Sequence, residues 1–250
     1  MRNKIHLSSI STLPQKSKNK ANIADENTKL LSKLADMQDK LFAQNKYSVL
    51  IILQGMDTAG KDSAVKHVFS GVNPAGCNVK SFKSPTSEES AHHFLWRISK
   101  ECPQKGMIKI FNRSQYEDIL MPKINQNLKS DILQERCHEI NAFEKGLIND
   151  QTILVKFFLN ISHEEQLKRL NERKSNPNKQ WKYQSEDEGD IEKHEKYKKA
   201  YEYIIENCSV AKPWHIIPAD KKWYKNYAIL HTIVGILEKH SINYPKLNAQ

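Results

Sequence analysis

The sequence predicts an α/β fold in which a parallel sheet is covered by helices on both faces, and three observations support it. Short apolar runs of strand length alternate along the chain with longer segments of helical periodicity. Such alternation favours parallel strands that are joined by crossover helices. The 250 residues suffice for one domain with a single hydrophobic core.

The N-terminal part of the chain predicts a basic arm followed by a helix. Residues 1–24 contain no aspartate or glutamate and several lysines, so we expect residues 1–28 to form a flexible basic arm. An organelle transit peptide is the alternative interpretation of this composition. Apolar side chains then recur at helical spacing from Leu30 to Phe42. We expect residues 29–250 to form a single domain that begins with this helix.

The first half of the domain predicts three strands separated by helices. In chain order, the segments are a strand at 47–53, a helix at 62–69, a weak strand at 78–82, a helix within 84–100 and a strand at 107–111. A glycine turn follows the first strand, and a polar turn at 112–118 follows the third.

The second half predicts two more strands and a basic insertion. Its segments are a helix at 131–149, an apolar strand at 152–159, a helix that starts after Ser162, a short strand at 214–220 and a closing helix that reaches Leu237. Residues 168–200 are rich in charge and poor in aliphatic side chains. We expect this stretch to lie over the core as a helical lid.

Composition narrows the possible partners. The formal net charge of +10 and the pI near 9.3 indicate a surface that attracts anions, such as nucleic acid, an anionic membrane or a polyanionic substrate. The four cysteines form no CxxC pair, which disfavours a zinc site or a disulfide framework. Since no apolar run approaches the ~20 residues of a membrane helix, we expect a soluble cytoplasmic protein without a membrane partner.

A glycine-rich turn joins the first strand to the next helix. Gly55, Gly60 and Lys61 satisfy the pattern GxxxxGK, which cradles phosphate on backbone N–H groups at a helix N-terminus. Ser63 and Lys66, on the first turns of the helix, are further candidates for phosphate binding. The alternative is a tight glycine turn of any α/β protein.

Two acids accompany this turn. Asp62 replaces the usual Ser or Thr that reaches magnesium, so either its carboxylate or the Ser63 hydroxyl is a candidate metal ligand. Asp62 is also a favourable residue for the first turn of a helix. Asp57, inside the turn, would repel phosphate unless a metal or the attacking group lies between them. We therefore assign both aspartates as candidate Mg²⁺ ligands.

Other candidates lie after the third strand and in the lid. Arg113 could neutralise a transferred phosphate, and Glu117 could position a metal or an acceptor, because ligands bind at the carboxyl edge of such sheets. The basic lid residues include Arg169, Arg173 and Lys182, which would close on phosphates. A solvated turn and solvated helix faces are the alternatives.

Several motifs together resemble the polyphosphate kinase 2 family. They are "LQGMDTAGKDS" at the phosphate turn, "SFKSPTSEESAHHFLWRI", "IFNRSQYEDIL" after the third strand, "FFLNISHEEQLKRLNER" with "PNKQWK" in the lid, and "PWHIIPADKKWYKN" near the end. The resemblance extends from about Leu30 to Pro245.

This resemblance implies a P-loop fold of nucleotide-kinase type and a Mg²⁺-dependent phosphotransferase. The partners it implies are inorganic polyphosphate and nucleoside mono-, di- and triphosphates. It also implies a homo-oligomer and no specific binding of nucleic acid. The residues on its catalytic motifs are Asp57, Lys61, Asp62, Arg113 and Glu117, and those on its lid are Arg169, Arg173 and Lys182. The pattern NRSxYE is similar to the branch that accepts both mono- and diphosphates, which would make AMP into ADP and ADP into ATP reversibly.

The chain differs from that branch at three places. Lys123 stands where arginine is usual, His194 where tryptophan is usual, and residues 207–214 lack a TST segment. An ATP-dependent P-loop nucleotide kinase is the second hypothesis, because its loop, sheet and lid would look alike. A basic P-loop protein that binds nucleic acid is the third, although no aromatic and basic reader motif supports it.

Overall fold

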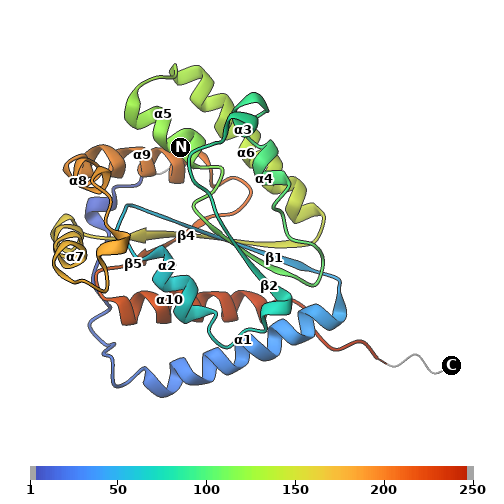
Figure 1. Ribbon diagram of the computed structural model, residues 1–250. Coiled ribbons are helices and arrows are strands. Elements are labelled where there is room, and N and C mark those ends of the chain that lie inside the picture. The colour runs from blue at the N-terminus through green and yellow to red at the C-terminus, as the bar shows by residue number, and fades with distance from the viewer. Residues whose placement is uncertain (1–3, 247–250) are drawn as a thin grey trace.

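Five parallel strands form one sheet in the computed structural model, which describes residues 4–246, except for the side chains of 186 and 187. The order across the sheet is β2-β3-β1-β4-β5 (Figure 1). The strands are β1 Ser48–Gly55, β2 Cys77–Ser81, β3 Ile108–Asn112, β4 Thr152–Asn160 and β5 Trp214–Pro218. The predicted parallel α/β fold is therefore confirmed.

The central strands are apolar because both of their faces are covered. Every residue of β1 and of β4 is buried, whereas the edge strand β2 is partly exposed. The register pairs Leu53 with Asn112 and Gly55 with Leu159. Since parallel strands end at one edge of the sheet, the turns after β1 and β3 lie side by side.

Two groups of helices cover the sheet (Figure 1). One face carries α1 Ala24–Gln44, α2 Lys61–Val68 and α10 Lys222–Leu237, and α10 packs on both of the others. The other face carries α5 Glu117–Asn125, α6 Ser130–Asn149 and α9 His194–Asn207, which also contact one another. None of the helices in the described part of the chain is long and apolar enough to cross a membrane.

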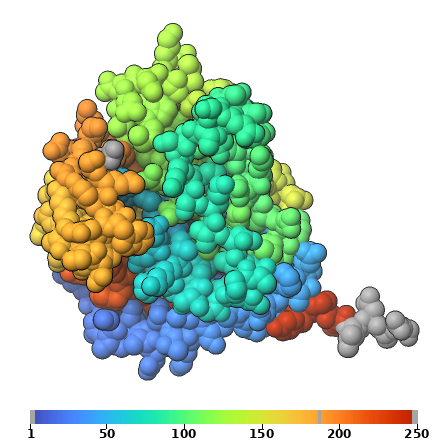
Figure 2. Space-filling model, in the orientation of Figure 1, coloured from blue at the N-terminus to red at the C-terminus, as the bar shows by residue number. Residues whose placement is uncertain are grey.

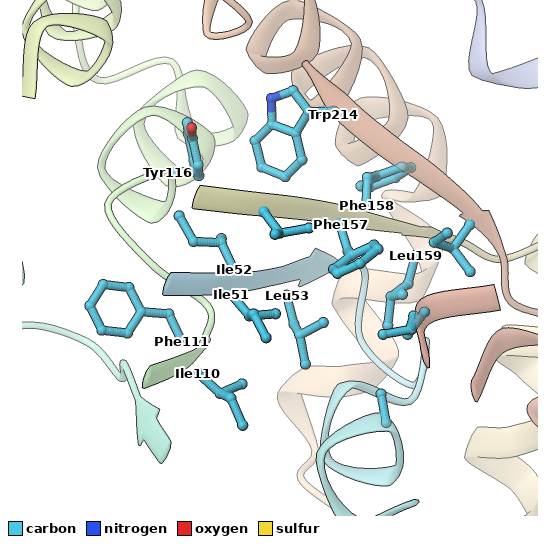
Figure 3. Packing of buried hydrophobic residues seen from close by; sticks show 14 of the residues in the cluster. Ile51, Ile52, Leu53, Ile110, Phe111, Tyr116, Phe157, Phe158, Leu159 and Trp214 are labelled. Carbon is cyan, nitrogen blue, oxygen red and sulfur yellow. The ribbon is translucent and has the colours of Figure 1, made fainter. Parts of the chain in front are cut away.

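The core lies between these layers and the sheet. Figure 3 shows side chains from neighbouring strands, among them Ile51 and Leu53 of β1 and Phe157 of β4, packed together. Tyr116 and Trp214 extend this packing on the face below α5 and α6, with ring centroids 4.7 Å apart. The sheet edge that carries the functional turns is thus held by a continuous apolar core.

The predicted flexible arm differs from the structure. Met1 to Asn3 lie outside the described residues, but within residues 4–23 Leu7 and Ile23 are buried against the body of the protein, while most of the other side chains are exposed. Leu7, within the 3-10 helix η1 Leu7–Ser9, is 1% exposed, and its N–H donates to Glu202 at 2.7 Å. Thr12 donates to Asp220 at 2.7 Å. The apolar residues of this segment are too widely spaced for a periodic signal, so the sequence showed only its charge.

The helices around the insertion also differ from the predictions. The helix expected within 84–100 is two short ones, α3 Ser87–Ala91 and α4 Trp96–Ser99. The polar turn expected at 112–118 runs into α5, which begins at Glu117, and the lid expected at 168–200 contains the first half of α9, on which Tyr197 is buried. The remaining elements are η2 Pro74–Gly76, α7 His163–Ser175, η3 Gln180–Lys182 and α8 Glu186–Glu192.

Candidate active site

The phosphate turn runs from the end of β1 to the start of α2. Gly60 adopts φ 93°, and a Cβ there would lie 2.5 Å from Lys225 Nζ. At Gly55, with φ 156°, a Cβ would lie 3.0 Å from the Cβ and the carbonyl oxygen of Leu159. At Gly55 a side chain would press against Leu159, and at Gly60 the left-handed φ disfavours any residue with a side chain, so both glycines of the pattern have a structural cause.

Lys61 begins α2 and folds back over the turn. Its Nζ donates to the carbonyls of Gly55 at 2.7 Å and Met56 at 3.2 Å. The residue is 8% exposed, and burial lowers the pKa of its ammonium against the opposing effect of Asp57. The only lysine of the GxxxxGK pattern is therefore fixed at the turn by two backbone acceptors.

Arg113 lies on the neighbouring turn after β3, in a left-handed conformation with φ 63°. Its N–H donates to the Leu53 carbonyl at 3.1 Å, which ties this turn to the end of β1. Its guanidinium donates to Asp57 at 2.8 Å. Although burial disfavours the charge, Asp57 and Glu117 raise the pKa of Arg113 above its ordinary value. Arg113 is therefore cationic and held toward the phosphate turn.

Three carboxyl groups surround this pair of cations. Burial raises the pKa of Asp57, but Lys61 and Arg113 outweigh it and hold that pKa below its ordinary value. Asp62 accepts a hydrogen bond of 2.6 Å from the Asn112 amide. Burial raises the pKa of Glu117, and the Gln54 amide, turned to point its nitrogen at Glu117, donates to it at 3.1 Å.

A cleft with a volume of about 1260 Å³ brings these groups together. Figure 2 shows it as a hollow between the lid, in orange, and the segment around α2 to α4, in teal. The predicted site residues that line it are Gly55, Asp57, Gly60, Lys61, Asp62, Arg113, Glu117, Arg173 and Lys182. The two turns and the lid therefore face one shared cavity.

Three predicted phosphate ligands do not line this cleft. Lys66 is exposed on α2, and Ser63 lies one residue beyond the lining residue Asp62. Arg169 is 5% exposed, and its guanidinium donates to Glu165 and to four backbone carbonyls. Its five N–H groups thus have acceptors in the protein, so Arg169 braces the phosphate turn instead of reaching into the cleft.

Several lining residues were missed by the sequence analysis. Arg97 of α4 donates to Asp118 at 3.1 Å and to the Lys83 carbonyl at 2.9 Å, so it fixes the wall of the cleft opposite the lid. Trp181 and Lys193 line the lid side, and Trp181 is 77% exposed. The signal that could have found Arg97 and Trp181 is their place inside the quoted family motifs.

Two of the residues that depart from the family pattern have clear contacts. His194 is buried at the start of α9, and burial lowers its pKa to about 4. Its ring contacts the Gln166 side-chain oxygen, and the Gln166 amide donates to the Asp57 carbonyl at 2.8 Å. Lys123 lies 4.0 Å from the centre of the Tyr203 ring. His194 therefore links the lid helix to the phosphate turn.

The comparisons with known proteins agree with this geometry. The family model described as polyphosphate kinase 2 matches residues 16–245. This chain belongs to the polyphosphate kinase 2 family. The resemblance read from its motifs is therefore confirmed, and it extends further toward the N-terminus than those motifs did.

Curated relatives carry names that describe phosphotransfer. An AMP/ADP-polyphosphate phosphotransferase of Meiothermus ruber is 41% identical over 86% of this chain and 80% of its own length. An ADP-polyphosphate phosphotransferase of Rhodopseudomonas palustris is 36% identical over 86% of this chain and 79% of its own length. Polyphosphate and nucleotides thus recur in the names of the relatives.

A solved structure has nearly the same fold. The crystal structure of polyphosphate kinase 2 from Arthrobacter aurescens TC1 has a TM-score of 0.95 and 36% identity, and the match covers 98% of this chain and 89% of that one. A putative polyphosphate kinase 2 from Pseudomonas aeruginosa has a TM-score of 0.86 and 28% identity, over 93% of this chain and 50% of that one.

Proposed function

We propose that this chain transfers the terminal phosphoryl group between inorganic polyphosphate and nucleoside mono- and diphosphates, converting AMP to ADP and ADP to ATP reversibly. The observation that carries the proposal is the single cleft in which the phosphate turn, Arg113 and the basic lid residues meet. Membership of the polyphosphate kinase 2 family and the name of the Meiothermus ruber relative support the choice of donor and of both acceptors.

The proposed roles follow from position and charge. Lys61 and the N–H groups at the start of α2 bind the phosphate at the reacting end of the donor. Arg113 stabilises the charge that develops on the transferred group, since it lies beside the turn and stays cationic. An acceptor phosphate oxygen then attacks in line, so that catalysis consists of positioning and charge neutralisation without a covalent intermediate.

Magnesium fits the acids of the cleft. Mg²⁺ in phosphotransferases is bound by one or two carboxylates together with substrate phosphates and water, and does not need a cage of protein ligands. Asp57 and Asp62 both line the cleft beside the phosphate turn, and the lowered pKa of Asp57 keeps its carboxylate ionised. We propose these two residues as its ligands, where the ion would neutralise phosphate charge.

The lid supplies further positive charge for a long polyanion. Arg173 of α7, Lys182 of η3 and Lys193 line the same side of the cleft, opposite Arg97. A polyphosphate chain carries about one charge per phosphate, so a row of cations along one wall matches it better than a single site would. The homo-oligomer and the cytoplasmic location expected from the sequence stay predictions.

Donor choice tests the proposal against the ATP-dependent alternative. The purified protein is incubated with Mg²⁺ and polyphosphate, with AMP or ADP as the acceptor and no ATP, and the nucleotides are separated by chromatography. We expect ADP from AMP and ATP from ADP. Formation of ADP only when ATP is added would instead support an ordinary nucleotide kinase.

A further inference from the structure

All six carbonyl groups of the phosphate turn accept a hydrogen bond from a side chain. Lys61 donates to those of Gly55 and Met56, as described above. Gln166 donates to that of Asp57 at 2.8 Å, and Arg169 donates to those of Thr58 and Ala59 at 3.0 and 3.2 Å. Lys225 of α10 donates to that of Gly60 at 2.6 Å.

This arrangement sets the direction in which the turn points. Across a trans peptide bond, the C=O of one residue and the N–H of the next point in opposite directions. Among the described residues, Gln166, Arg169 and Lys225 do not line the cleft, so the carbonyls of residues 57–60 that they hold point away from it and leave N–H groups of the turn to face the cleft. Carbonyl oxygens would repel a phosphate, so donors that hold them away prepare the turn for an anion.

Lys225 is the unusual member of this set. It is fully buried, and among the described residues the structure gives its ammonium group one hydrogen-bond acceptor, the Gly60 carbonyl. A buried ammonium group normally needs an opposite charge beside it. The charged groups with the largest effects on it are mostly cations: Arg169 of α7, Lys222 of its own helix and Lys61 of α2, opposed by the Asp62 carboxylate.

The environment of Lys225 therefore lacks negative charge that a bound phosphate would supply. Gly60 lies between Lys225 and the cleft. Because Gly60 has no side chain, Lys225 Nζ can come within 2.5 Å of the place where a Cβ of residue 60 would lie. Burial, together with Arg169 and Lys222, lowers the pKa of Lys225 to about 7. An anion in the turn would favour the charged form of this lysine and restore its proton.

We propose that Lys225 is a positioning residue that orients the phosphate turn through the Gly60 carbonyl and that gains a proton when an anion occupies the turn. The proposal rests on the phosphate-binding role of the turn in the proposed function, and it adds a regulation of that site by pH. Phosphate affinity then depends on the protonation of a residue outside the cleft.

The sign of the pH dependence follows from linkage. Below pH 7 Lys225 already carries its proton, so binding an anion takes up little. Above pH 7 the proton must come from solvent, and affinity should fall by up to tenfold per pH unit. At pH 8, a group with a pKa of about 7 is mostly neutral, so binding should take up a large part of one proton.

Calorimetric titration with tripolyphosphate and Mg²⁺ at pH 8 tests this directly. Titrations in two buffers of different ionisation enthalpy give the number of protons taken up per ligand bound. The variants Lys225→Met and Lys225→Arg should each take up measurably fewer protons than the wild type, because neither side chain titrates in this range. An unchanged proton uptake in both variants would overturn the proposal.

The two variants separate charge from packing. Lys225→Arg keeps a cation and a donor, so its affinity for tripolyphosphate should stay near that of the wild type at pH 7 and lose its decline above that pH. Lys225→Met should bind about ten- to a hundredfold more weakly, as expected for the loss of a charged hydrogen bond. The exposed neighbour Lys221→Met, which removes a charge from the same helix end, should keep the proton uptake of the wild type.

Binding without turnover also separates this inference from the proposed function. If the wild type does not bind tripolyphosphate, the phosphate-binding role of the turn is wrong. If it binds tripolyphosphate with a pH-independent affinity, only the role of Lys225 is wrong. Equal kcat and equal KM for polyphosphate in Lys225→Met and the wild type would also contradict the positioning role.

Discussion

A buried ion pair beneath the Arg113 turn should make Glu144 one of the most sensitive residues for stability. Lys156 of β4 donates to Glu144 of α6 at 2.7 Å, and both side chains are 0% exposed. Glu144 also accepts hydrogen bonds from Gln115, at 3.0 Å, and from the Tyr116 hydroxyl. Because Gln115 and Tyr116 lie between Arg113 and Glu117, this pair supports the turn that carries both.

The variant Glu144→Gln keeps the shape of the side chain and removes its charge, which leaves Lys156 buried without a counter-ion. Breaking a buried pair in this way costs about 3 to 5 kcal/mol. The variant should therefore lose stability by about this amount.

Urea denaturation of the wild type and the variant at pH 7 measures this loss. The double variant Glu144→Gln/Lys156→Met removes both charges and should recover part of the stability. The control Glu135→Gln makes the same change on an exposed face of α6 and should shift the free energy of unfolding by less than about 0.5 kcal/mol. A loss below about 1 kcal/mol in Glu144→Gln would refute the reasoning.

Four further outcomes are expected. Lys61→Ala should abolish phosphoryl transfer and leave the circular dichroism spectrum unchanged, because it removes the cation fixed at the turn. Normal turnover by this variant would show that Lys61 does not bind the phosphate. Arg173→Ala should raise KM for polyphosphate about tenfold or more without unfolding the chain, because the loss of one charged hydrogen bond costs roughly 1.5 to 3 kcal/mol. If KM and kcat are both unchanged, Arg173 is a solvent-exposed residue without a role in binding. Glu117→Asn should lower kcat/KM for AMP more than for ADP, since a carboxylate that helps to hold Mg²⁺ near the acceptor matters more for the less charged substrate. Equal losses for both acceptors would make Glu117 a general catalytic residue. The free energy of unfolding should fall by up to about 2 kcal/mol as the pH drops from 6.5 to 4, because the lowered pKa of His194 means that only the unfolded chain binds a proton there in this range. In His194→Gln the plot of unfolding free energy against pH should be flatter, and an identical plot would remove His194 as the cause.

The phosphate turn could be predicted because its signal is local. Gly55, Gly60 and Lys61 lie within seven residues, between an apolar run and a helix start, and the steric needs of both glycines follow from that turn. The neighbouring turn with Arg113 followed from the rule that parallel strands end at one edge of the sheet. Both predictions depended on short stretches of sequence.

The bracing side chains could not be predicted in the same way. Arg169 and Lys225 are 111 and 165 residues from the carbonyls that they bind, so a sequence pattern gives no sign that their partners are backbone atoms of the turn. Arg169 was expected to bind phosphate because its charge was visible and its partners were not. The core face of α9 was likewise hidden by charges, since Tyr197 and Tyr201 alternate with lysines and glutamate.

The central claim is that this cleft transfers phosphate from polyphosphate to a nucleotide. Its most direct test uses ³²P-labelled polyphosphate with AMP and Mg²⁺ in the absence of ATP, and Lys61→Ala prepared in parallel as a control for contaminating kinases. We predict that the label appears in the β-phosphate of ADP with the wild type and not with the variant. Absence of labelled ADP with the wild type, or equal labelling with both proteins, would contradict the account.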